Sequence, residues 1–359
     1  MIVDVQIENF RGIHRLEVNG AARINVIVGG NGIGKTSVLE ALCFANSPTP
    51  VIAQQLDNFR DFWPDYKARS TSGAFRYLFG RLDAPLRVCT RRDSGVETVE
   101  MVLADVNDAW PEELEPDVSP AGKSQGVLLT TERHELQWSL TTPNRSFKSH
   151  VRVRADGLAV ARSIENLPNA NGKLRMCSFS TGTPALMPNE IGHFSSLRAT
   201  NHLEPLLACL RQMFPQVVDL ELLAPNGQQA APHVRFANKE MLPLAVLGLG
   251  AQKVVALMTR LTMTPGGVAL VDEIESGLHY SVLVPVLRQF ASLAATLDVQ
   301  VFATTHSYEC LQAVHAALGD KPGELAVFRL ESVPDGRLLA VRIDARHRDA
   351  VFQVGAEVR

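Results

Sequence analysis

Gly29-Gly30-Asn31-Gly32-Ile33-Gly34-Lys35-Thr36 carries the strongest pattern in this sequence. It consists of a glycine, four further residues and then Gly-Lys-Thr, which is the spacing of a phosphate-binding loop. The apolar run at residues 24–28 predicts a buried strand before the loop, and residues 37–44 predict a helix after it. Glycines let successive backbone N–H groups turn towards phosphate oxygens, and the start of a helix adds positive potential.

Two side chains at the end of this loop carry the expected chemistry. Lys35 would reach the terminal phosphates of a nucleotide, and the hydroxyl of Thr36 would hold Mg²⁺. The alternative is a glycine-rich turn that matches the spacing by chance. The order of strand, loop and helix favours the phosphate loop.

Size and composition limit the class of protein. The 359 residues suffice for one large domain or two smaller ones, with 46% hydrophobic and 20% charged residues. The formal net charge of −3 argues against a dedicated DNA clamp but is compatible with a local basic groove. The five scattered cysteines indicate a reducing compartment. Without a signal-peptide pattern or an apolar run of membrane length, we expect a cytoplasmic protein with no membrane segment.

The order of predicted elements indicates an α/β protein. Residues 1–28 predict two strands joined at Asn19-Gly20, and short alternating runs between residues 75 and 154 predict an antiparallel sheet. Helical periodicity covers residues 193–214, and residues 241–261 contain a second helix that is entered through Gly248 and Gly250, with a hairpin between the two segments. Strands and helices then alternate, with strands predicted at residues 268–271 and 300–304 and helices at residues 281–297 and 307–318. Two further strands are predicted at residues 324–331 and 337–343. Such alternation predicts a parallel sheet.

Charge is unevenly distributed in the middle of the chain. Residues 100–120 carry almost only acidic side chains, and residues 145–175 are mostly basic. One interpretation is two solvated faces of opposite sign. The other is that the basic stretch contacts nucleic acid or an acidic partner.

Asp272 and Glu273 directly follow the apolar strand at residues 268–271. Beside a phosphate loop, such a strand delivers its acids at the carboxyl edge of the sheet, where ligands bind. We expect Asp272 to bind Mg²⁺ and Glu273 to polarise the attacking water. The alternative is a buried strand followed by a solvated acidic turn.

His306 ends the next strand, at residues 299–305. A neutral His306 would donate a hydrogen bond to the γ-phosphate or to the attacking water. The alternative is a residue at the start of a helix that Ser307 caps.

Together these motifs resemble an ABC-type ATPase head, in particular those of bacterial ATPases related to the RecF, SMC and OLD groups. Ile7-Glu8-Asn9-Phe10-Arg11-Gly12-Ile13 is similar to their first strand and turn. Asp272-Glu273-Ile274-Glu275-Ser276-Gly277-Leu278-His279 and Thr304-Thr305-His306-Ser307 are similar to variants of this subgroup, and Ala356-Glu357-Val358-Arg359 to its usual C-terminus. The resemblance covers residues 1–45 and 240–330 well and the middle poorly.

The resemblance implies a P-loop NTPase of the ABC-type head class, with a mainly parallel core sheet, an antiparallel side sheet and a helical signature lobe. Residues 1–359 would form one ATPase domain. Within it, residues 1–47 and 255–359 would form the nucleotide-binding core, 75–160 the antiparallel subdomain and 165–254 the signature lobe.

The resemblance also implies a homodimer. ABC heads associate head to tail and hold two ATP molecules between them, so that the signature motif of one subunit faces the phosphate loop of the other. The signature candidate is Leu247-Gly248-Leu249-Gly250-Ala251-Gln252, in which Gly248 replaces the family's serine. The backbone N–H groups of Gly248 and Gly250 would still favour an anion at a helix start. The alternative is a glycine-broken amphipathic helix.

Further site residues follow from the same resemblance. Arg11 matches an arginine that contacts nucleotide, with a surface salt bridge as the alternative. Gln54 and Gln55 are both candidates for the Q-loop, and His279 would contact the partner subunit. The catalytic set is then Lys35, Glu273 and His306, and the metal ligands are Thr36 and Asp272. The expected ATP-binding residues are Arg11, Gly29, Asn31, Gly32, Ile33, Gly34, Lys35, Thr36, Ser37, Gly248 and Gly250.

Three functions compete at this level. The first is a Mg²⁺-dependent ATPase that dimerises on ATP and acts as a switch for an effector protein in antiphage defence. The second is a nucleic-acid-binding ATPase of recombination or repair. The third, which only Gly248 favours, is a scaffold that binds nucleotide without turnover. Long heptads are absent, and too few residues follow His306 for a Toprim nuclease domain.

Overall fold

The computed structural model describes residues 1–46, 75–105, 134–153, 159–165, 177–180, 188–199, 203–224, 230–319, 321, 323–333 and 337–343. The Q-loop candidates Gln54 and Gln55 lie outside the described residues, as do the C-terminal residues 356–359 and most of the acidic stretch. No helix in the described part of the chain is long and apolar enough to cross a membrane.

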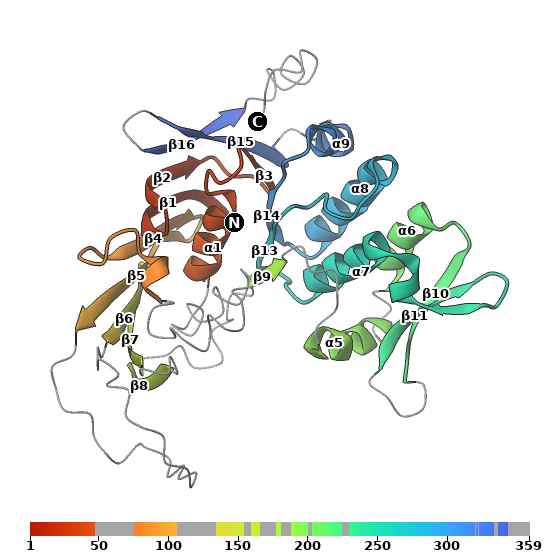
Figure 1. The fold of residues 1–359 in the computed structure, drawn as a ribbon, viewed down its shortest axis with the longest axis horizontal. Coiled ribbons are helices and arrows are strands. Elements are labelled where there is room, and N and C mark those ends of the chain that lie inside the picture. Colours follow the sequence, from red (N-terminus) through yellow and green to blue (C-terminus); the bar gives the residue numbers. More distant parts are fainter. Residues whose placement is uncertain are drawn as a thin grey trace, which may run out of the picture.

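A six-stranded sheet forms the centre of the molecule (Figure 1). Its strands, in spatial order, are β16 (Leu338–Ile343), β15 (Leu325–Ser332), β3 (Ile24–Val28), β14 (Gln300–Thr304), β13 (Val268–Val271) and β9 (Cys177–Ser180). All neighbouring pairs from β15 to β9 are parallel, and only β16 is antiparallel. The parallel sheet expected from the sequence is confirmed.

Helices cover both faces of this sheet because its strands are apolar on both sides. In β14, Phe302 packs with α1 (Lys35–Asn46), whereas Val301 and Ala303 face the opposite cluster. That cluster is formed with α6 (Glu204–Met213), α7 (Leu249–Thr262), α8 (Tyr280–Thr296) and α9 (Tyr308–Leu318). Strands buried on both faces are typical of parallel sheets.

A seven-stranded antiparallel sheet covers the other side of α1 (Figure 1). In spatial order it contains β2 (Ile13–Asn19), β1 (Ile2–Phe10), β4 (Leu86–Arg92), β5 (Gly95–Asp105), β6 (His134–Thr141), β7 (Ser146–Val153) and β8 (Ala159–Glu165). A short 3-10 helix, η1 (Phe75–Leu78), precedes β4. Because α1 lies between the two sheets, almost all of its residues are buried.

Two expectations for the N-terminal region are corrected. Residues 1–28 form three strands, and the first hairpin turns at Arg11-Gly12, where Arg11 has a φ of 51°. The chain also turns at Asn19-Gly20, but the strand that follows, β3, enters the other sheet. β1 and β2 therefore belong to the antiparallel sheet, not to the core expected for residues 1–47, because their apolar alternate residues pack on α1.

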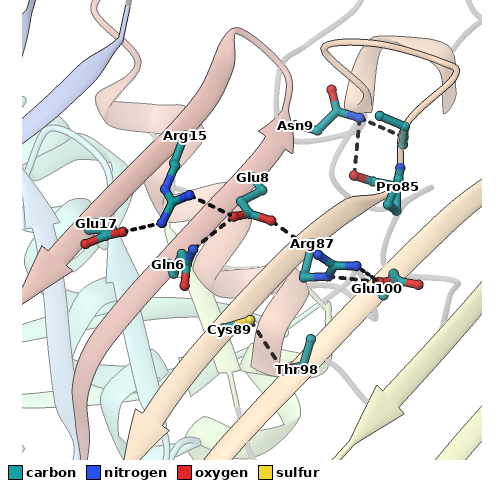
Figure 2. A network of polar contacts seen from close by, with 11 residues as sticks. Gln6, Glu8, Asn9, Arg15, Glu17, Pro85, Arg87, Cys89, Thr98 and Glu100 are labelled. Atoms are coloured by element: carbon teal, nitrogen blue, oxygen red, sulfur yellow. Dashed lines mark hydrogen bonds and ion pairs between the residues drawn. The ribbon is translucent and has the colours of Figure 1, made fainter.

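The outward-facing polar side chains of this sheet pair across neighbouring strands (Figure 2). Glu8 on β1 accepts hydrogen bonds from Gln6 at 2.9 Å and from Arg87 at 3.4 Å. Arg87 on β4 also donates to Glu100 on β5 at 2.9 Å. The side chains of Glu8, Arg87 and Glu100 are between 27% and 39% exposed. They form a network that is partly exposed to solvent. The strands that carry it, β1, β4 and β5, are direct neighbours in the sheet.

A separate lobe joins the central sheet through α7. It contains α5 (Pro188–Ala199), α6, β10 (Val217–Leu223), β11 (Ala231–Phe236), β12 (Met241–Pro243) and the 3-10 helix η4 (Leu244–Leu247). The expected hairpin is present as β10 and β11.

Two expectations for this lobe are corrected, and one is confirmed. The helical run at residues 193–214 is two helices, because Pro205 occupies the first turn of α6 and starts a new helix. The segment at residues 241–261 contains the expected helix, which starts after Gly248 and follows β12 and η4. β9 lies within the region assigned to the lobe, yet it pairs with β13 in the central sheet.

Candidate nucleotide-binding site

Three segments distant in sequence meet at the carboxyl edge of the central sheet. They follow β3, β13 and β14, which are neighbours in the sheet. The loop at residues 29–34 leaves β3, Asp272 and Glu273 leave β13, and Thr305 and His306 leave β14. Ligands of open α/β sheets bind at this edge.

The phosphate loop has the backbone that its glycines permit. Gly29 has a φ of 147°, and a Cβ there would lie 2.9 Å from the carbonyl oxygen of Leu330. Gly34, with a φ of 109°, accepts the backbone N–H of Val38 at 3.0 Å as α1 begins. Only glycine adopts these conformations without strain.

Lys35 is held against the loop. Its Nζ donates to the carbonyl oxygens of Gly29 at 2.7 Å and Gly30 at 2.9 Å, and the residue is 5% exposed. Burial lowers the pKa of Lys35, while the nearby carboxylates of Asp272, Glu273 and Glu275 act to raise it. The ammonium group therefore lies within the loop beside three acidic groups.

Asp272 connects the loop to the adjacent strands. Its Oδ2 accepts the Thr36 hydroxyl at 2.8 Å, and its Oδ1 accepts the Thr304 hydroxyl at 2.5 Å. The Thr36 hydroxyl and the Asp272 carboxylate are hard oxygen donors, which fit Mg²⁺. Among the described residues, no group of three or more His, Cys, Asp or Glu side chains is placed to hold a metal ion. Two protein oxygens suit Mg²⁺, which often takes one or two protein ligands together with substrate phosphates.

Glu273 has a constrained backbone and an accessible side chain. Its φ is 48°, an unusual value for a non-glycine residue, and its N–H donates to the Thr304 hydroxyl at 2.9 Å. Its side chain is 49% exposed, and its Oε1 lies 3.4 Å from the Nε2 of His306. The carboxylate thus faces solvent beside an imidazole.

The structure shows the helix start that was the alternative for His306, while contact of its side chain with the γ-phosphate or the attacking water stays a prediction. The side chain of His306 lies beside Glu273, and its backbone N–H donates to Glu275 at 3.0 Å. Ser307 is the N-cap of α9, and its hydroxyl oxygen accepts the N–H of Cys310 at 3.1 Å. The cap fixes the start of α9 and therefore the position of the residue before it.

The signature candidate lies at the start of α7. Gly248, with a φ of 91°, is the N-cap residue. Gly250 lies against the turn after Glu273, where an added Cβ would be 2.6 Å from the carbonyl oxygen of Gly277. Val246 and Leu249 are 66% and 62% exposed, so the start of this helix presents apolar side chains to solvent. Contact between this motif and nucleotide stays a prediction.

Arg11 and His279 have other partners in the described structure. The Nε of Arg11 lies 2.6 Å from a carboxylate oxygen of Glu40, with 7% and 0% of the two side chains exposed. The salt bridge given as the alternative is therefore buried and not on the surface, and contact of Arg11 with nucleotide stays a prediction. His279 is the N-cap of α8 and lies against the ring of Tyr280, which is 69% exposed.

Two residues at this site have no counterpart in the sequence analysis. Thr304 bridges Asp272 and the backbone of Glu273, and Lys253 of α7 donates to the carbonyl oxygen of Glu273 at 2.5 Å. The position of Thr304 at the end of the strand before His306 could have indicated its role at the site. The position of Lys253 on the apolar side of a predicted helix was a weaker indication.

Two family models and one named relative match this chain. A family model described as an AAA domain, putative AbiEii toxin, type IV TA system, matches residues 129–311, more than half of the chain. A second model, described as an AAA domain, matches residues 4–50. An ATP/GTP phosphatase from Helicobacter pylori (strain ATCC 700392 / 26695) is 22% identical over 349 residues, which cover 89% of each chain.

Solved structures of SMC heads are also similar. The SMC head domain from Thermotoga maritima is 12% identical, with a TM-score of 0.41 over 96% of this chain and 99% of that one. An Smc head with an extended coiled coil, bound to the C-terminal domain of ScpA and derived from Pyrococcus furiosus, is 9% identical. Its TM-score is 0.47, and the match covers 99% of both chains.

Proposed function

Since this chain belongs to the family of AAA domains described as putative AbiEii toxins of type IV TA systems, we propose that it is a Mg²⁺-dependent ATPase with an ABC-type head. One observation carries the proposal. The loop lysine, the Thr36–Asp272 hydrogen bond and the Glu273–His306 pair lie along one edge formed by adjacent parallel strands.

Each side chain has a part in this reaction that its surroundings support. Lys35 and the backbone N–H groups of the loop bind the phosphates, and Thr36 and Asp272 hold Mg²⁺. Mg²⁺, when bound, neutralises charge on the phosphate oxygens. Glu273 accepts a proton from the attacking water, and His306 orients the Glu273 carboxylate from 3.4 Å. Catalysis then depends on positioning and charge stabilisation.

Phosphate release tests this proposal. Wild-type protein should hydrolyse ATP only with Mg²⁺, and Glu273→Gln should be about 10²- to 10⁴-fold slower because it lacks the base. Glu273→Gln should still bind ATP, since glutamine keeps the shape of the side chain. Equal rates for the two proteins would contradict the assigned role of Glu273.

We further propose that ATP closes a head-to-tail homodimer, which hydrolysis opens again. Leu249 and Tyr280 lie at the starts of α7 and α8, and Val246 lies in η4 just before α7; all three are exposed and offer apolar surface for a second copy. Light scattering of Glu273→Gln tests this: the mass should double with ATP and Mg²⁺, and a monomer under both conditions would contradict it.

The output of this switch is proposed to act on an effector protein in antiphage defence. The matched family is described as a putative toxin of a type IV TA system, and because such a system has two components, the description supports a partner protein encoded nearby. Co-expression with the product of the adjacent gene tests this. Co-elution should depend on ATP and should be lost in Lys35→Ala.

A further inference from the structure

Lys253 is a buried lysine that the reaction outlined above does not use. It lies on α7 and is 4% exposed. Its Nζ donates to the backbone carbonyl oxygen of Glu273 at 2.5 Å. Because buried ammonium groups are costly without partners, such a contact requires a structural or functional reason.

The contact falls on a backbone that is already constrained. Glu273 has a φ of 48°, and its carbonyl oxygen also accepts the N–H of Ser276 at 2.9 Å. Its own N–H is held by the Thr304 hydroxyl. Unusual backbone conformations persist only where surrounding groups fix them. Lys253 is the side chain from α7 that takes part in this fixation.

A second contact joins α7 to the same turn. Gly250 lies one helical turn before Lys253, and a Cβ on it would lie 2.6 Å from the carbonyl oxygen of Gly277. α7 therefore contacts the turn both at residue 273 and at residue 277. A movement of the start of α7 would displace the segment that carries Glu273.

Charge compensation alone does not account for this geometry. Burial lowers the pKa of Lys253, while Glu275, Glu273 and Asp272, followed by Cys310, act to raise it. Yet Nζ donates to a main-chain oxygen, and within the described part of the chain no hydrogen bond joins it to one of these carboxylates. An ammonium placed in this way sets the position of the backbone.

We propose that Lys253 is a positioning residue that holds the main chain of Glu273 from the signature helix, so that its carboxylate stays beside His306. This inference rests on the proposed ATPase function and extends it. The first turn of α7 carries the signature candidate. If Lys253 holds Glu273 in place, the position of α7 affects catalysis within the same subunit.

Four proteins test the proposal: wild type, Lys253→Met, Lys253→Arg and Lys321→Met. The exposed Lys321 supplies a matched control for the loss of a lysine. We expect kcat of Lys253→Met to be about 10- to 100-fold lower, because small misplacements of catalytic groups are costly. KM should change by less than about twofold, since among the described residues no hydrogen bond or ion pair joins Lys253 to the phosphate loop. Lys253→Arg should recover most of the rate, and Lys321→Met should match wild type.

Hydrogen exchange supplies a readout that does not depend on turnover. In Lys253→Met, amides of residues 273–278 should exchange several-fold faster than in wild type, with residues 281–296 unchanged. A normal kcat, an Arg variant as slow as the Met variant, or unchanged exchange at 273–278 would each overturn the proposal. A wild-type protein that releases no phosphate, with faster exchange in Lys253→Met, would instead contradict the ATPase function and leave the positioning contact standing.

Discussion

The carboxyl edge of the central sheet and the polar face of the antiparallel sheet both gather charged side chains, but they hold them differently. On the polar face, Arg87 and Glu100 pair between adjacent strands and are 39% and 31% exposed (Figure 2). At the edge, Thr36 and Asp272 meet from positions 236 residues apart, and Lys35 is 5% exposed. Charge alone therefore does not mark the site.

The difference lies in what fixes the side chains. Exposed pairs depend on flexible side chains in water and contribute about 0–1 kcal/mol. At the edge, the buried hydroxyl of Thr304 accepts one hydrogen bond and donates another, and the ends of three strands set the spacing. We therefore expect substitutions at the edge to change activity strongly and substitutions on the polar face to change little.

The largest effect is expected for Lys35→Ala. Loss of the loop ammonium should lower the rate of phosphate release by roughly 10²- to 10³-fold, the range for removing one group that stabilises developing charge. Arg87→Ala on the polar face is the control and should keep the wild-type rate. A comparable loss of rate in both variants would remove the distinction between the two regions.

A large effect on stability is expected away from both regions, at the buried Arg11–Glu40 pair between the first hairpin and α1. Arg11→Met removes the guanidinium that pairs with the fully buried Glu40 carboxylate. The free energy of unfolding should fall by about 3–5 kcal/mol. Urea denaturation measures this, and the double variant Arg11→Met/Glu40→Met should recover much of the loss. A single variant within 1 kcal/mol of wild type would be inconsistent with a buried pair.

A smaller effect, specific to the metal, is expected for Thr304→Val. The hydroxyl orients Asp272, so its loss should raise the Mg²⁺ concentration at half-maximal activity by about 10-fold, as for other partners of metal ligands. Thr304→Ser keeps the hydroxyl and should behave like wild type. Mg²⁺ titrations of ATP hydrolysis provide the measurement, and an unchanged midpoint in Thr304→Val would exclude this role.

The smallest effect is expected for the Arg87–Glu100 pair. A double-mutant cycle with alanine should give a coupling energy of about 0.2–1 kcal/mol. Because salt screens exposed charges, the coupling should shrink between 0.1 M and 1 M salt. Coupling above about 2 kcal/mol would place this pair in the same class as the edge contacts.

Local patterns predicted the loop at residues 29–34 and the parallel arrangement of the central strands. The apolar runs that become β3, β13 and β14 are long enough to identify on their own, and the parallel sheet follows from their alternation with helices. Once the sheet is parallel, the loop at residues 29–34 and the acids after β13 must share one edge.

Contacts set by tertiary structure could not be predicted in this way. The Asn19-Gly20 pair is a strong hairpin signal. The strand after Gly20 nevertheless pairs in the other sheet, and the first hairpin forms at Arg11-Gly12. The bonds of Thr304 and Lys253 join segments 31 and 20 residues apart, and the partner in each is the backbone of Glu273. Backbone partners leave no pattern of residue types in a sequence.

A crystal structure of Glu273→Gln with ATP and Mg²⁺ tests the central claim most directly. We expect Lys35, Asp272, residue 273 and His306 to surround one triphosphate, with Lys35 moved from the carbonyl oxygens of Gly29 and Gly30 onto the phosphates. ATP bound away from the loop at residues 29–34, or these four side chains directed into different pockets, would contradict it.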